Sequence, residues 1–582
     1  MTAPIAPIDY QVEIADLHAH QFRVTLTLPQ PSAQQRLSLP VWIPGSYLVR
    51  EFSRHLSGLE ARQGKRPVAL RQLDKCTWQA ECRGSTPLVV SGLVYAYDAS
   101  VRTAWLEASR GFFNGTSLFL RCEGHEARAH RVSLPGLPKG WQVATGMRAV
   151  GTARRPVFES ADYDELIDHP FELGPFWRGT FEACGVPHEF VVAGAWPGFD
   201  GDRLIADAKR ICEAQIRFWH GHAKPPFQRY VFLLNAVDDG YGGLEHRAST
   251  ALICGRRDLP RKGQAGLTDG YVTLLGLISH EYFHTWNVKR LKPSEFAPYD
   301  LTRENTTELL WFFEGFTSYY DDLLLLRAGL IDEARYLKLV AKTVNQVLGT
   351  PGRRVQSVAE ASFDAWIKYY RPDENSANAT VSYYTKGSLV ALALDLRLRA
   401  EGRGSLDAVL RRLWQRSQGG PIDEAAIAEA LAFVGKRSYD DELQAWVHGT
   451  ADLPLAELLA PLGVRWTRET PQLQHRLGAR VAEAGLKVQA VLRGGAAEAA
   501  GLAAGDELVG VDDWRLGRLD DLLPLGAFDR PVTLLVARDR RLLRLPFQAA
   551  AVEGAVTLSA DPKPGAVVLR RRAAWLKPVA PA

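Results

Sequence analysis

The pentad His280-Glu281-Tyr282-Phe283-His284 constrains this chain more than any other feature. It follows an apolar stretch, residues 274–279, that is typical of a helix. Positions i and i+4 lie one above the other on a helix face, so both imidazoles can bind one zinc ion. Glu281 then points at a water in the ion's open position. The spacing therefore predicts a zinc site held by His280 and His284, with Glu281 as the general base.

A third protein ligand is needed, because zinc in a hydrolase usually has three protein ligands and one water. Glu314 lies within the largely apolar run Leu309–Leu326. Burying an acid in such a run is costly unless a cation compensates its charge. The competing acids Glu304 and Glu308 lie at the polar start of the same segment, where solvent and the helix dipole account for them. Glu314 is the predicted third ligand, and one zinc ion per chain is expected.

Bulk composition excludes several classes of protein. A chain of 582 residues is too long for one hydrophobic core and should form about three or four domains. A net charge of +4 over this length predicts no nucleic-acid surface. No run approaches the ~20 apolar residues that a membrane span needs, so no membrane partner is expected.

The cysteines and the first residues bear on location. None of the six cysteines forms a close Cys-x-x-Cys pair, which favours a reduced cytoplasmic protein with buried thiols. The segment Met1–Pro7 lacks a basic region followed by an apolar one, so we expect no secretory signal. A periplasmic protein whose signal has been removed is the alternative.

The pattern of residue types changes twice along the chain. Alternating segments such as Tyr10–Leu28, Val89–Tyr95 and Ser117–Arg121 predict strands and an all-β sandwich. Helical patterns dominate from about 270 to 450. Short strands return after about 465, and a last strand is predicted at Ala566–Leu569 before a polar tail. The predicted domains are 1–170 (β-sandwich), 171–463 (catalytic), 464–550 (a small β-rich domain) and 551–582 (strand and tail).

The pentad with its continuation through Arg290, together with Glu314-Gly315-Phe316-Thr317, resembles the gluzincin metallopeptidases. The closest resemblance is to the glycyl-aminopeptidase family, and Pro44-Gly45-Ser46-Tyr47 also looks like that family. The resemblance implies a multidomain α+β protein. Its parts would be an N-terminal all-β sandwich, a thermolysin-like, mainly helical catalytic domain and a C-terminal PDZ domain.

A glycine-rich segment resembles a substrate-binding strand. Gly242-Gly243-Leu244-Glu245-His246 looks like the Gly-x-Met-Glu-Asn motif of related aminopeptidases, with His in place of Asn and Leu in place of Met. The resemblance implies that Glu245 holds the substrate's ammonium group and that Gly242, Gly243 and His246 line the peptide. The alternative is a Gly-rich turn with a surface Glu and His.

A pair of tyrosines also resembles a motif of the related aminopeptidases. Tyr383-Tyr384-Thr385-Lys386-Gly387 matches their Tyr-x-Lys-Gly motif, which implies that the Tyr384 phenol donates to the oxyanion. Tyr383 could hold this role instead, and a core tyrosine with a satisfied hydroxyl is a further alternative.

Residues 465–550 resemble a PDZ domain. Ala500–Asp506 matches that fold's helix-to-strand turn. The carboxylate loop would be Leu477-Gly478-Ala479, followed by an edge strand through Val481 that a peptide tail could extend. The loop lacks the first Gly of Gly-Leu-Gly-Phe, so a docking or packing role is an equal alternative. No ligand or base candidate lies beyond Tyr384, so this domain is predicted to take no part in the chemistry.

These features predict a zinc-dependent aminopeptidase that acts on peptides with a free N-terminus. The resemblance alone implies a preference for a small first residue, Gly or Ala. One alternative is a zinc endopeptidase of the same chemistry. Another is a PDZ scaffold that binds peptide tails, retains zinc and has weak activity.

Overall fold

The computed structural model describes residues 6–152 and 155–577. Residues 1–5, part of the segment in which no secretory signal is expected, lie outside the described residues. The chain divides into two compact units, one made mainly of residues 1–305 and the other mainly of residues 306–579. Within the described residues, no helix has the length and apolar character needed to cross a membrane.

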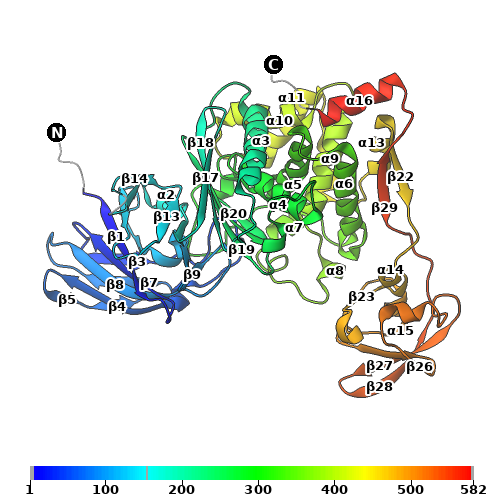
Figure 1. Cartoon of the computed structure of the whole chain (residues 1–582), viewed down its shortest axis with the longest axis horizontal. Coiled ribbons are helices and arrows are strands. Elements are labelled where there is room, and N and C mark those ends of the chain that lie inside the picture. Colours follow the sequence, from blue (N-terminus) through cyan, green and yellow to red (C-terminus); the bar gives the residue numbers. More distant parts are fainter. Residues whose placement is uncertain (1–5, 153–154, 578–582) are drawn as a thin grey trace. The chain divides into compact units, whose positions relative to one another are not determined.

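The first unit begins with three sheets (Figure 1). The eight-stranded sheet has the order β14-β15-β12-β1-β2-β8-β4-β5, and the two four-stranded sheets have the orders β13-β16-β10-β9 and β11-β3-β7-β6. The strands are β1 (Ile8–Asp16), β2 (Gln21–Leu28), β3 (Gln34–Ser38), β4 (Leu56–Gln63), β5 (Arg66–Val68), β6 (Leu70–Gln72), β7 (Thr77–Glu81), β8 (Leu88–Tyr95), β9 (Ala104–Glu107), β10 (Arg110–Phe113), β11 (Arg121–Cys122), β12 (His130–Ser133), β13 (Gln142–Thr145), β14 (Arg148–Ala149), β15 (Val157–Ser160) and β16 (Phe171–Gly174). Every second residue of β2 is buried, as expected for a strand with one face on the core. The β-rich N-terminal domain is confirmed.

One predicted strand in this region is wrong. Ser117–Arg121 was expected to be extended, but its first residues belong to helix α1 (Gly115–Leu118). A Cβ at residue 115 would lie 2.9 Å from Cα of Ile167, the last residue of α2 (Tyr163–Ile167). This close approach of two backbones, which only glycine allows, overrides the strand propensity of the side chains that follow.

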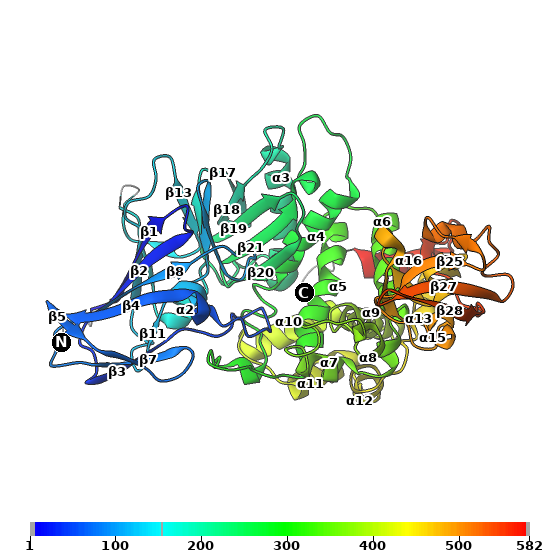
Figure 2. The same ribbon diagram turned by 90° about the horizontal axis from the view of Figure 1, so that it is seen from below.

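The pentad helix lies on a fourth sheet, in which parallel and antiparallel pairings are mixed (Figure 2). The order is β17 (Trp177–Ala183), β18 (Val186–Ala193), β19 (Tyr230–Val237), β21 (Ser249–Gly255) and β20 (Gly242–Glu245). Strands β18, β19 and β21 are parallel, and the two edge strands, β17 and β20, are antiparallel to their neighbours. Helix α4 (Asp269–Phe283) packs against β20, β21 and α3 (Gly201–His220). The glycine-rich strand therefore lies beside the pentad helix.

The second unit is mainly helical. Its helices before the C-terminal part are α5 (Leu310–Arg327), α6 (Glu333–Leu348), α7 (Val358–Phe363), α8 (Ser376–Ala379), α9 (Thr385–Ala400), α10 (Leu406–Ser417), α11 (Glu424–Gly435), α12 (Asp440–Leu443) and α13 (Leu455–Leu459). Helices α5 and α9 cross closely, because a Cβ at residue 315 would lie 2.6 Å from Cα of Gly387. The predicted helical region is confirmed.

The C-terminal part contains a PDZ-like domain and a returning segment. The PDZ-like elements are α14 (Leu473–Leu477), β23 (Ala479–Val481), β24 (Val488–Val491), α15 (Ala496–Ala500), β25 (Glu507–Val511), β26 (Trp514–Arg515), β27 (Val532–Arg538) and β28 (Arg541–Phe547). Strand β22 (Val464–Arg468), which precedes them, pairs with β29 (Val556–Ala560), which follows them. The chain thus leaves and re-enters the helical region through one antiparallel pair.

The strand predicted at Ala566–Leu569 is wrong, since these residues begin helix α16 (Ala566–Leu576). The helix fixes Trp575, which is fully buried and donates from Nε1 to the Tyr319 hydroxyl at 3.0 Å. Arg572 forms an ion pair with Glu333 at 3.0 Å. Packing on α5 and α6 therefore decides the conformation of this segment, and a short apolar run cannot reveal it.

Candidate active site

Helix α4 carries His280 in its last turn, and His284 is its C-cap residue. Its N-cap Thr268 accepts a hydrogen bond from the Tyr271 amide at 3.1 Å. The imidazole of His284 is 2% exposed, and its Nδ1 lies 2.8 Å from the carbonyl of Asn287. A carbonyl only accepts, so Nδ1 carries the proton and Nε2 keeps its lone pair. The two Nε2 atoms of His280 and His284 face each other at 3.0 Å.

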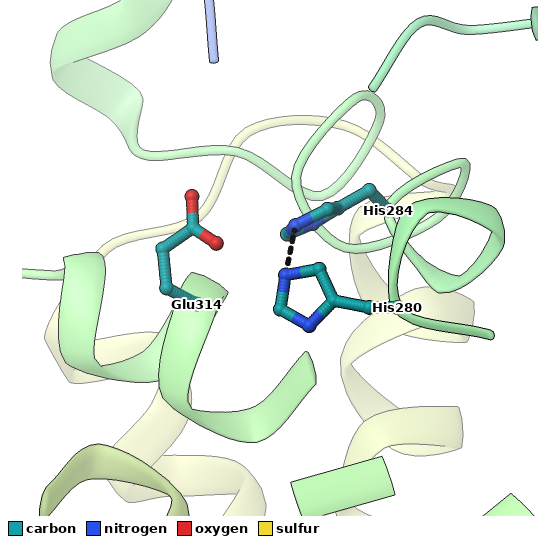
Figure 3. A group of neighbouring side chains, drawn as sticks. All are labelled: His280, His284 and Glu314. Carbon is teal, nitrogen blue, oxygen red and sulfur yellow. Dashed lines mark hydrogen bonds between the residues drawn. The ribbon is translucent and has the colours of Figure 1, made fainter. Parts of the chain in front are cut away.

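The carboxylate of Glu314 lies near the two imidazoles (Figure 3). One ligand atom from each of His280, His284 and Glu314 lies within 4.8 Å of the others. Glu314 is 1% exposed, in an aromatic-rich stretch of α5. Two imidazole nitrogens and a buried carboxylate are the donor set that catalytic zinc prefers. These residues therefore fit the metal that the sequence predicts.

Two further carboxylates lie on the His284 side of this group. Glu245, Glu281 and His284 form a second set whose ligand atoms all lie within 4.8 Å of one another. Glu281 is 5% exposed and Glu245 is 3% exposed. A Cβ at residue 243 would overlap the carboxylate of Glu281, so only glycine fits in β20 at this point. The side chain of Glu281 in the pentad therefore packs against the backbone of Gly243 in the strand motif.

The loop that contains Gly45 covers Glu245. A Cβ at residue 45 would lie 2.5 Å from either carboxylate oxygen of Glu245, and the φ of Gly45 is +94°. The loop is held from the other side, because Trp42 donates from Nε1 to the Asp300 carbonyl at 2.8 Å. Residues 44–47 show only a family resemblance in the sequence. Nothing in the sequence alone places this loop against Glu245.

His246, the last residue of the glycine-rich motif, lies beside Asp168. It is 1% exposed, and its Nδ1 lies 3.2 Å from Oδ1 of Asp168. Lys289 contacts the same oxygen at 2.7 Å, and Arg247 donates to the other oxygen at 2.8 Å. Burial opposes ionisation of Asp168, but these two cations outweigh it and hold its pKa well below the usual range. We name this group the Asp168 node; the sequence did not reveal Asp168 or Lys289 as its members.

Tyr384 lies at the N-terminus of α9 among other aromatic rings. Burial, reinforced by the negative charge of Glu314, holds its pKa well above the usual value. The ring of Tyr383 stacks on it with centroids 4.8 Å apart. The hydroxyl of Tyr370 lies 3.4 Å from the Tyr384 hydroxyl. Tyr370 lies in a loop outside the predicted motifs, so no sequence pattern points to it.

Three family models match this sequence. The model of the M61 glycyl aminopeptidase matches residues 273–390, and that of the peptidase M61 N-terminal domain matches residues 9–175. A PDZ-domain model matches residues 465–519. The first match contains the pentad, Glu314 and Tyr384.

A solved structure matches almost the whole chain. It is an aminopeptidase N family protein from Idiomarina loihiensis, 38% identical, with a TM-score of 0.92 over 98% of this chain and 100% of that one. The fold and these matches define a multidomain peptidase of the aminopeptidase class. The chain belongs to the M61 glycyl aminopeptidase family. The predicted family, fold class and enzyme class are confirmed.

More distant structures also align. The M1 zinc metallopeptidase from Deinococcus radiodurans is 17% identical with a TM-score of 0.47, over 78% of this chain and 95% of that one. A mutant of it bound to a Tyr-Ser-Ala substrate is 15% identical with a TM-score of 0.49 over the same shares. Likeness at this level carries no argument about function. No curated protein matches the sequence.

Proposed function

We propose that this chain is a zinc-dependent aminopeptidase that releases a small N-terminal residue, Gly or Ala, from peptides. One zinc ion per chain would be held by His280, His284 and Glu314. Two clusters of metal-ligand atoms that share His284, with every residue but the half-buried His280 buried, carry the proposal. When bound there, zinc supplies a water of lowered pKa and polarises the scissile carbonyl.

Glu281 is the proposed general base. It takes the proton of the attacking water and passes it to the leaving amine. Its carboxylate lies on the backbone of Gly243 because that position has no side chain. This contact limits the rotamers open to Glu281 and holds the base beside the imidazole of His284.

Tyr384 is the proposed donor to the developing oxyanion. A phenol is protonated at neutral pH, as a hydrogen-bond donor must be, and burial raises the pKa of Tyr384 further. Tyr370, whose hydroxyl is within 3.4 Å, is proposed to orient that phenol. Tyr383 remains the alternative donor, although its ring is fully buried.

Glu245 is proposed to bind the α-ammonium group of the substrate, so that cleavage counts from a free amino terminus. Gly242 and Gly243 would line the peptide through the backbone of β20, whose outer edge pairs with no other strand in the described residues. His246 would act indirectly, by tying the end of β20 to Asp168. The Gly45 loop limits the space at Glu245, in keeping with a small first residue.

The PDZ domain is proposed to dock on the helical part or to bind the carboxyl terminus of a peptide. The Asn378 side chain donates to the Val491 carbonyl at 2.8 Å and accepts from the Arg493 amide at 2.9 Å. These bonds to the end of β24 favour docking. We further propose a cytoplasmic location, with a periplasmic one as alternative, because all six cysteines are free thiols.

Hydrolysis of free and N-acetylated Gly- and Ala-leading peptides, with and without a chelator, tests the proposal. We expect cleavage of the free peptides only, lost with chelator and restored by zinc. Equal cleavage of free and acetylated peptides would support the endopeptidase. Zinc retention with negligible cleavage of any peptide would support the PDZ scaffold.

A further inference from the structure

The second unit contains a cavity of about 280 Å³ among α6, α9, α13 and β22, to which no role is yet assigned. Most of its wall is apolar, including Val344, Leu389, Leu455 and Trp466. Ligand sites of small molecules begin at roughly this size, so the cavity has room for one residue-sized molecule.

Lys386 lines this cavity and is buried, with only 2% of its surface exposed. Its Nζ has no hydrogen-bond partner within the described part of the chain. An ammonium group buried without a partner is costly. Its place in the first turn of α9 adds to the cost, since the helix dipole is positive there. An anion in the cavity would remove both penalties.

The basic groups around the cavity other than Lys386 already have partners, and the exposed acid Glu457 adds a negative charge to the wall. Arg353 binds the carboxylate of Asp452 at 2.8 and 3.4 Å. Arg468 forms an ion pair with Glu553 at 2.7 Å. Asp452 attracts Lys386 but forms no hydrogen bond with it, and burial lowers the pKa of Lys386. Lys386 is therefore the wall cation that a ligand would satisfy.

We propose that this cavity binds an aliphatic carboxylate, with its charge on Lys386 and its hydrocarbon part against Leu389 and Trp466. The apolar wall favours such a molecule over inorganic phosphate, which has no surface to bury there. Free amino acids and the C-terminal residue of a peptide share this chemistry. The site takes no part in the zinc chemistry, so its test is independent of the test of the proposed activity.

Calorimetric titration of the full chain tests this site with hexanoate as the probe and hexanamide and phosphate as comparisons. We expect saturable hexanoate binding. Hexanamide should bind more weakly by roughly 10- to 100-fold because one charge-assisted hydrogen bond is lost. Phosphate keeps its charge but should also bind more weakly, because it has no hydrocarbon part to bury. Lys386→Met should weaken hexanoate binding to a similar extent. Lys342→Met, which removes an exposed lysine of α6, is the matched control and should leave binding unchanged.

A second variant keeps the test valid if Lys386→Met does not fold. Ala456 is an exposed wall residue, so Ala456→Glu places a negative charge at the mouth without altering the core. It should weaken hexanoate binding. Equal binding by wild type and either folded variant, or no saturation by hexanoate in the wild type, would overturn the site.

Leucine, N-acetylleucine and leucinamide separate the two sources of ligand. A free amino acid as ligand predicts that leucine binds more tightly than N-acetylleucine. A peptide C-terminus predicts the reverse, since N-acetylleucine carries an amide in place of the amine. Leucinamide lacks the carboxylate, and binding as tight as that of leucine would contradict the role of Lys386.

Discussion

The β20–α4 region and the PDZ domain both have buried cores, but they bury different side chains. The PDZ core consists of residues such as Leu477, Val488 and Leu534. Its fully buried acid, Asp506, is held by Arg538 through bonds of 2.7 and 2.8 Å. The β20–α4 region instead buries two glutamates with a histidine, with ligand atoms within 4.8 Å. A lone buried acid is neutralised within the protein, whereas clustered acids and imidazoles indicate a bound cation.

The strongest test of this comparison removes the base and leaves the metal ligands. Glu281→Gln should lower kcat by roughly 10²–10⁴, the range attributed to general acid–base catalysis, because the amide cannot accept the water's proton. Zinc content, measured by elemental analysis, should stay at one per chain. Glu314→Gln should instead lose zinc. Full zinc retention in Glu314→Gln would remove Glu314 from the ligand set.

The next effect concerns the two phenols. Tyr384→Phe should lower kcat by roughly 10²–10³ with little change in KM, the cost of one oxyanion donor. Tyr370→Phe should lower kcat less, and much less in a Tyr384→Phe background, because the two hydroxyls act together. Additive losses in the double variant would show that Tyr370 does not act through Tyr384. An unchanged kcat in Tyr384→Phe would pass the role to Tyr383 or to neither.

A change near Glu245, the proposed binding site of the substrate's ammonium group, should have a smaller effect, and this effect should be on KM. Gly45→Ala should displace the carboxylate of Glu245, since the added Cβ would lie 2.5 Å from its oxygens. We expect KM for a Gly-leading peptide to rise about tenfold or more, the equivalent of a displaced charged contact. Gly64→Ala has a similar backbone strain, with φ of +58°, but an open surrounding, and is the control. Equal KM values in both variants would show that the Gly45 loop does not affect substrate binding.

Asp168 represents buried acids that are neutralised by cations of the protein, and the free energy of unfolding tests this role. Asp168→Asn leaves Lys289 buried without its partner and should lower the free energy of unfolding by about 3–5 kcal/mol. Asp164→Asn breaks an ion pair of Arg247 whose acid is half exposed, and should cost at most about 1 kcal/mol. Because the pKa of Asp168 is lowered, its contribution is present above the usual carboxyl range and is lost as pH falls through the lowered value. Denaturant titrations at several pH values measure both effects.

The sequence was sufficient where one periodic element carries the information. The pentad spacing and the acid in the apolar run Leu309–Leu326 each depend on a single helix, and the three side chains lie together. It was insufficient where distant segments decide the outcome. The Gly45 loop, the Asp168 node and Tyr370 reach the site through tertiary contacts that no local pattern records. The strand expected at Ala566–Leu569 failed for the same reason, because Trp575 packs beside Tyr319.

The smallest expected effect is that of removing the PDZ domain, and the structure decides where to cut. Truncation near residue 463 would also remove β29 and α16, including the fully buried Trp575, and would destabilise the helices. An internal deletion is better, because Arg468 pairs with Val556 across β22 and β29. Joining these two residues by a short Asn-Gly turn restores a hairpin of ordinary geometry.

This deletion should leave kcat for a dipeptide within about twofold, because no proposed ligand, base or donor lies beyond Tyr384. Asn378→Ala in the full chain is the matched variant, since it breaks both bonds to β24 and keeps the domain. If the domain only docks, neither variant changes hydrolysis of a dipeptide. A folded, zinc-loaded deletion that is inert on a dipeptide would mean that the PDZ domain helps to build the site. The PDZ domain would then contribute to catalysis, and its contrast with the β20–α4 region would be wrong.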